Sequence, residues 1–84
     1  MDYRTARQLV SQFWDSLDAY DRLVEQYHQL HQDPDRAGAQ GKSFLSLHFE
    51  LVDNMREIAD RTRECYKQLR DSGYDDRWID QNRT

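Results

Sequence analysis

The amino-acid sequence predicts an all-α protein in which two long helices fold back on each other as an antiparallel hairpin. Apolar and aromatic residues recur at alternating steps of three and four in two stretches, residues 2–32 and 43–72. Only an α-helix places residues with that spacing on one side. The only proline and two of the three glycines lie between the stretches, in residues 33–42. A connection this short favours antiparallel packing.

Residues with known capping preferences mark the ends of both predicted helices. Asp2 and Ser43 are suitable N-caps, because a side-chain oxygen there accepts a hydrogen bond from a free backbone N–H of the first turn. Gly73 suits the left-handed position that follows a helix, so residues 73–84 form a tail. A second reading starts the second helix at Pro34, but two glycines in its first turns would each cost about 1 kcal/mol. We therefore expect residues 33–42 to form the loop.

Composition predicts one small domain over residues 1–84. A hydrophobic content of 37% is low for a core built by one chain, although its regular placement argues against disorder. The formal net charge of −4 disfavours general binding to nucleic acid or to an anionic membrane.

Location and redox chemistry follow from what the sequence contains. Residues 1–5 do not begin a basic-then-apolar signal segment, and no apolar run approaches the roughly 20 residues of a membrane span. Cys65 is the only cysteine, which excludes a disulfide framework and a cysteine-based zinc site. We expect a cytoplasmic protein, of a cell or of a virus-infected host cell, with no membrane contact.

A third apolar stripe predicts that the hairpin pairs with a second copy. With Val10 at heptad position a and Phe13 at d, the g positions of both helices are also almost entirely apolar. A lone hairpin closed by its a and d positions would leave this stripe in water, forgoing on the order of 10 kcal/mol of burial. We therefore predict a homodimeric four-helix bundle. Its predicted interface comprises Leu9, Leu23, Leu30, Phe44, Leu51, Ile58 and Cys65.

The three histidines are weak candidates for a metal site. His28 and His31 are one helical turn apart, and antiparallel pairing brings His48 beside them. Imidazoles from two helices can bind Zn²⁺, but no carboxylate of suitable heptad phase completes the coordination shell. The preferred interpretation is structural, with no metal and no cofactor.

Aromatic and acidic residues outside the apolar stripes are candidates for binding a partner protein. Aromatic side chains at the edge of a charged surface are typical binding hot spots. The alternatives are that the acidic residues only keep the exterior soluble and that the tail covers Trp14. The predicted partner-binding residues are Trp14, Asp15, Asp18, Asp21, Glu25, Tyr74 and Trp78.

A row of arginines on the second helix supports a second interpretation. Arg56, Arg63 and Arg70 follow one another every seven residues. In an antiparallel pair Arg56 would approach Asp21, and Arg63 would stack on Trp14. The row could instead contact RNA, or the acidic faces could mimic nucleic-acid phosphate, although the net charge disfavours nucleic acid.

These observations predict a function in binding and not in catalysis. The sequence has no Gly-rich phosphate loop, no Ser/His/Asp arrangement and no histidine within heptad reach of Cys65, so we expect no enzyme and no catalytic residues. The sequence predicts a small protein-binding regulator that acts as an adaptor, chaperone or inhibitor on an unidentified protein. The alternative is a nucleic-acid-related regulator.

Overall fold

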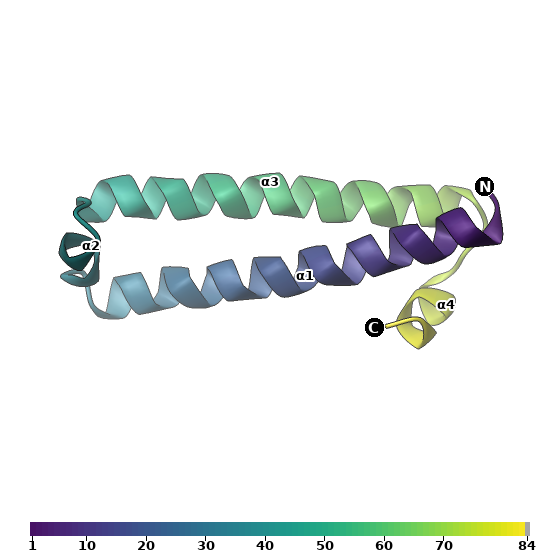
Figure 1. Cartoon of the computed structure of the whole chain (residues 1–84), viewed down its shortest axis with the longest axis horizontal. Helices are drawn as coiled ribbons and strands as arrows, with labels where there is room; N and C mark the ends of the chain where they lie inside the picture. Colours follow the sequence, from purple (N-terminus) through teal and green to yellow (C-terminus); the bar gives the residue numbers. More distant parts are fainter. Residues whose placement is uncertain (84) are drawn as a thin grey trace.

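In a computed structural model of the chain, which describes residues 1–83, two long helices lie side by side as a hairpin (Figure 1). Helix α1 spans Tyr3–Gln32 and helix α3 spans Phe44–Asp71. The N-terminus of α1 lies beside the C-terminal end of α3, so the two helices are antiparallel (Figure 1). The principal extents of 48 × 18 × 16 Å describe an elongated molecule.

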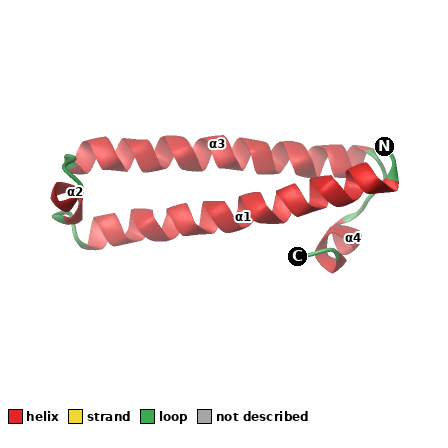
Figure 2. Cartoon of the chain, in the orientation of Figure 1, coloured by secondary structure: helices red, strands yellow, loops and turns green. Residues whose placement is uncertain are grey.

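Two short helices lie near the ends of this hairpin, one in the connection and one beside α1 (Figure 1). Helix α2 spans Arg36–Ala39 within the connection, and helix α4 spans Asp76–Gln81 within the tail. All four elements are helices, and the described residues form no strand (Figure 2). The all-α hairpin expected from the sequence is therefore present, with a helical turn inside each segment expected to be a loop or tail. None of the helices within residues 1–83 combines the length and apolar character of a membrane span.

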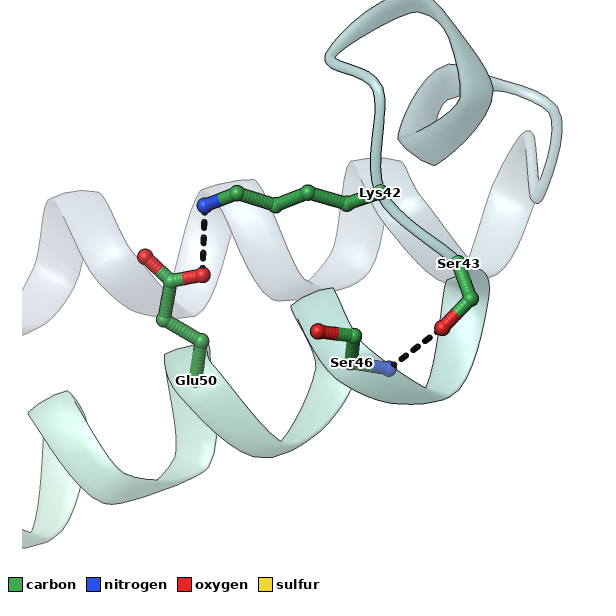
Figure 3. A network of polar contacts seen from close by, with 4 residues as sticks. All are labelled: Lys42, Ser43, Ser46 and Glu50. Atoms are coloured by element: carbon green, nitrogen blue, oxygen red, sulfur yellow. Dashed lines mark hydrogen bonds and ion pairs between the residues drawn. The ribbon is translucent and has the colours of Figure 1, made fainter.

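Side-chain caps start both long helices. Asp2 accepts a hydrogen bond of 2.7 Å from the backbone N–H of Thr5, and Ser43 accepts one of 3.1 Å from that of Ser46. Figure 3 shows the second cap beside an ion pair of 2.6 Å between Lys42 and Glu50. Each cap satisfies an N–H that the first helical turn leaves without a partner.

Gly73 ends α3 and turns the chain toward α1. Its φ of 94° lies in the left-handed region that a residue with a Cβ rarely adopts. Tyr74 donates its backbone N–H to the carbonyl of Leu69 at 3.0 Å, and Gly73 donates to that of Arg70 at 3.1 Å. This pair of hydrogen bonds is a Schellman motif, and it directs the following residues back along the hairpin.

The buried core divides into two clusters, one near each end of the hairpin. The cluster at the chain termini has a buried core of Ala6, Val10, Trp14, Leu69 and Ile79. Five half-buried side chains pack against this core, namely Leu9, Phe13, Leu17, Tyr74 and Trp78. The cluster at the α2 end has a core of Leu30, Ala37, Leu47 and Leu51. Between them, Tyr20, Val24 and Ala59 are only half-buried.

The side of α3 that packs against α1, which we call its seam, differs from the expected one. Its buried side chains lie mainly at the d and g positions, with Thr62 and Leu69 at d and Leu51 and Cys65 at g. The expectation that positions a and d close the hairpin is therefore wrong for α3, where g replaces a. The physical reason is that g, a and d are all apolar, so rotating the helix toward g exchanges one apolar stripe for another.

Candidate protein-binding surface

A groove lined by aromatic side chains runs between α1, α3 and α4. It encloses about 550 Å³. Charged side chains at its edge come from α3 and α4, namely Arg63, Asp76 and Asp80. The remaining lining consists of Phe13, Trp14, Leu17, Tyr20, Ala59, Thr62, Tyr66 and Ile79. A concave apolar site with a few charged groups at its edge is a common form of binding site.

A cluster of rings lies at the other end of the hairpin, beside α2. The ring centroids of Tyr27 and His31 are 4.4 Å apart, and those of His31 and Phe44 are 5.2 Å apart. His48 lies 5.2 Å from Tyr27 and 5.2 Å from Phe49. Such tilted and edge-to-face contacts are favourable, so this end of the hairpin is stabilised by ring packing.

Large apolar side chains in this region remain in contact with water. Leu45 is 62% exposed and Phe49 is 58% exposed. Leu45 starts the a stripe of α3, and the same stripe continues into the groove at Ala59 and Tyr66. Because residues seven apart share one side of a helix, the groove and the ring cluster belong to one side of the hairpin.

We call this side the aromatic face. It is defined by Leu17, Tyr20, Val24 and Tyr27 of α1 and by Leu45, Phe49, Val52, Ala59 and Tyr66 of α3. All nine residues are half-buried or exposed, and Leu45 and Phe49 are the most exposed of them. Contiguous exposed apolar surface of this kind commonly marks an interaction site.

The opposite side of the hairpin is more polar. Its larger groove is lined by Ala19, Arg22, Leu23, Gln26, Asn54, Glu57, Ile58 and Arg61. Arg61 and Glu57 form an exposed ion pair of 3.6 Å on α3 within this groove. The two sides of the hairpin therefore differ clearly in character.

The predicted dimer-interface residues are spread over several parts of the hairpin, and only Leu23 and Ile58 line the polar groove. Leu30, Leu51 and Cys65 are at most 6% exposed and pack within the hairpin. Leu9, Leu23, Phe44 and Ile58 are half-buried. The structure thus does not bring these seven residues together as one exposed stripe, because the rotated seam of α3 takes up its g positions.

Helix α4 covers Trp14, which was predicted to bind a partner. Trp14 is 6% exposed, and its indole Nε1 donates a hydrogen bond of 3.0 Å to the backbone carbonyl of Ile79. The guanidinium of Arg83 lies 4.0 Å from the Trp14 ring centroid. The expected stacking of Trp14 on Arg63 is therefore wrong, because the tail supplies Arg83 in its place. Trp14 is not available on the surface in this arrangement.

The other predicted anchors of the tail are partly covered. Tyr74 and Trp78 are half-buried, with ring centroids 4.3 Å apart, and both pack against the terminal core cluster. The predicted binding residues of the tail did not include Ile79, which is the buried residue of α4. A signal was present, because Asp75 stands three residues before Trp78 and caps α4 by accepting its N–H at 2.9 Å.

The four acidic candidates of α1 are all exposed. Asp15, Asp18, Asp21 and Glu25 project along the outer part of that helix. The ion pairs found in residues 1–83 involve other carboxylates, so the expected pairing of Asp21 with Arg56 is absent from this part of the chain. The four carboxylates therefore remain available to an external partner.

The arginine row is divided by α4. Arg70 lies 3.6 Å from a carboxylate oxygen of Asp76, and Arg7 donates a hydrogen bond of 2.6 Å to the Asn82 side chain. Arg56 and Arg63 are exposed, and Arg63 lines the groove. The tail thus contacts Arg7 and Arg70 and leaves two arginines, Arg56 and Arg63, beside the aromatic face.

Two of the three histidines meet. A ring nitrogen of His31 lies 3.0 Å from one of His48, within hydrogen-bonding distance. His28 instead contacts the edge of Tyr27, with centroids 6.1 Å apart. No cluster of three potential metal ligands exists among the described residues.

Two titratable side chains of α3 have displaced pKa values. Burial raises the pKa of the Cys65 thiol, with a further contribution from Glu64. The Tyr66 hydroxyl donates a hydrogen bond of 2.6 Å to Asp76, and this hydrogen bond raises the pKa of Tyr66. Both groups therefore keep their protons more firmly than in water, which suits positioning roles.

Comparisons of the chain with models of protein families, with curated proteins and with solved structures found no match.

Proposed function

We propose that this chain is a small non-catalytic regulator that binds other proteins, and that two of its hairpins pair into a four-helix bundle. The observation that carries the proposal is the aromatic face, where Leu45 and Phe49 are more than half exposed. Burying a side chain of this size stabilises a complex by roughly 1.5–3 kcal/mol. A partner that covers the face buries both of these side chains together with the half-buried residues around them.

The chemistry of the surface suits association between helices. The face runs from Leu17 to Tyr27 on α1 and from Leu45 to Tyr66 on α3 and is built from helical stripes, so another helix can lie along it with side chains interdigitating. Tyrosine and phenylalanine are enriched in the buried centres of protein interfaces. The exposed Asp15 of α1, on the side of that helix away from the aromatic face, remains our proposed contact for a different protein, as adaptor, chaperone or inhibitor.

A photo-crosslinking amino acid at two matched positions tests this proposal. Phe49 lies on the aromatic face and is replaced in one variant; Asn54 lies in the opposite groove and is replaced in the control. Irradiating the purified variants should give an adduct of twice the 10.2-kDa chain mass from position 49 and little from position 54. Equal yields at the two positions, or no adduct from position 49, would contradict the proposal.

A further inference from the structure

The aromatic face is bordered by charges of opposite sign. On α1, Asp18, Asp21 and Glu25 follow Trp14 by four, seven and eleven residues, which places them on the helix edge that Trp14 occupies. We call them the acidic rim. On α3, Arg56 stands seven residues before Arg63, which lines the groove, and Asp60 lies between them on the same helix edge, so these three residues carry a net charge of +1. We call these two arginines the basic rim.

The grooves show which parts of the two rims lie at the same height along the hairpin. Leu17 and Tyr20 line one groove with Ala59 and Thr62. Leu23 lines the other with Ile58. Asp21 therefore stands level with the segment of α3 between Arg56 and Arg63.

From these positions we infer that a second copy of the chain covers the aromatic face, with both α2 turns at the same end of the bundle. The inference rests on the proposed function and specifies its partner. A two-fold axis parallel to the helices places α1 of one copy over α3 of the other. Each Asp21 then meets the partner between Arg56 and Arg63, where the two arginines outnumber the single carboxylate of Asp60.

The opposite orientation brings like charges together. A two-fold axis perpendicular to the helices places α1 over α1 and α3 over α3, with the α2 turns at opposite ends. The two acidic rims then face each other, and juxtaposed like charges disfavour an interface. A uniformly basic or acidic partner would match one rim and be repelled by the other. A second copy in the inferred orientation supplies both complementary signs.

Spin labels on the α2 turn distinguish the two orientations. Ala39 is exposed on α2, so an Ala39→Cys label in a Cys65→Ala background reports the distance between turns. In the inferred bundle the two labels lie within about 30 Å, since packed helices are about 8–10 Å apart. In the opposite orientation the 48 Å length of the chain separates them.

Charge reversal provides a second measurement, because the two orientations predict opposite changes in the affinity of the dimer. Asp21→Arg should weaken the dimer on the order of 10-fold, since a rim ion pair is lost at two symmetric sites. Adding Arg56→Glu should recover part of that loss. In the opposite orientation Asp21→Arg should instead tighten the dimer, because it relieves repulsion between acidic rims. Asp15→Arg, on the stripe of Arg22 away from the face, is the matched control and should leave the affinity nearly unchanged.

The outcomes separate the inference from the proposed function. A short label distance together with weakening by Asp21→Arg supports the inference. A dimer with a long label distance, or one tightened by Asp21→Arg, overturns the inference and leaves the proposed function standing. A protein that stays monomeric at every concentration overturns both.

Discussion

The indole Nε1 of Trp14 donates a hydrogen bond of 3.0 Å to the carbonyl oxygen of Ile79, which lies 65 residues further along the chain. This contact joins the first helix to the last. Ile79 is 4% exposed, and its side chain belongs to the same core cluster as Trp14. Helix α4 is therefore part of the folded core, and the tail is anchored by a buried apolar residue.

Replacing Ile79 with alanine should undock α4. Loss of a buried isoleucine side chain typically costs about 2–5 kcal/mol, and the short helix has few other apolar contacts to hold it. In a Trp78→Phe background, the fluorescence of Trp14 should shift to longer wavelength and the denaturation midpoint should fall. Gln81→Ala, at an exposed position of the same helix, should change neither. An unchanged Trp14 spectrum in the Ile79 variant would show that the docking does not depend on this side chain.

The contact between Tyr66 and Asp76 should couple α3 to α4. Tyr66→Phe and Asp76→Ala each remove the 2.6 Å hydrogen bond, so their effects on the free energy of unfolding should be less than additive. The bond raises the pKa of Tyr66, so its contribution is present below the ordinary value of 10.0 and is lost as the pH rises through the higher folded value. Chemical denaturation of the four variants at neutral and alkaline pH measures both effects. Strictly additive effects would contradict the coupling.

The N-cap of α1 should make stability depend on pH in the acid range. Hydrogen bonds from Thr5 lower the pKa of Asp2 below its ordinary value of 3.8. Its contribution is therefore complete above that value and is lost as the pH falls through the lower folded value. Asp2→Ala should be less stable than the parent at neutral pH, and the difference should shrink in acid. Asp2→Asn, which still caps but does not titrate, is the control, and a pH-independent effect of Asp2→Ala would argue against this account.

The thiol of Cys65 should react slowly. It is 6% exposed, and burial raises its pKa, so little of the nucleophilic thiolate is present at neutral pH. Its reaction with a disulfide reagent should be much slower in the folded protein than in denaturant. A Cys65→Ser, Ser72→Cys variant carries an exposed thiol for comparison. Equal rates for the two thiols in the folded state would show that Cys65 is accessible.

The hairpin was predictable from the sequence, and so were the positions at which its two long helices begin and α3 ends. The heptad spacing required two helices, and the capping residues Asp2, Ser43 and Gly73 stand where the structure uses them. These features are local, because they depend on residues within one or two turns of each other.

The direction in which α3 faces was not predictable from spacing alone. With g, a and d all apolar, rotating the helix by one stripe exchanges Leu45 for Leu51 in the seam at little cost. Packing against α1 selects Leu51, which is 5% exposed, and leaves Leu45 62% exposed. The burial of Trp14 was also not predictable from nearby residues, because it depends on how Ile79 and Arg83 of the tail pack against it. The candidate surface therefore emerged from the side of the hairpin that the sequence had assigned to its seam.

The measurement that tests the central claim most directly is the mass of the unmodified protein in solution, determined by sedimentation equilibrium over a range of micromolar concentrations. A chain that pairs through its aromatic face should sediment at twice its 10.2-kDa mass, and Phe49→Glu should return it to the single-chain mass with its helicity retained. A fully helical protein that sediments at 10.2 kDa throughout this range would contradict the account.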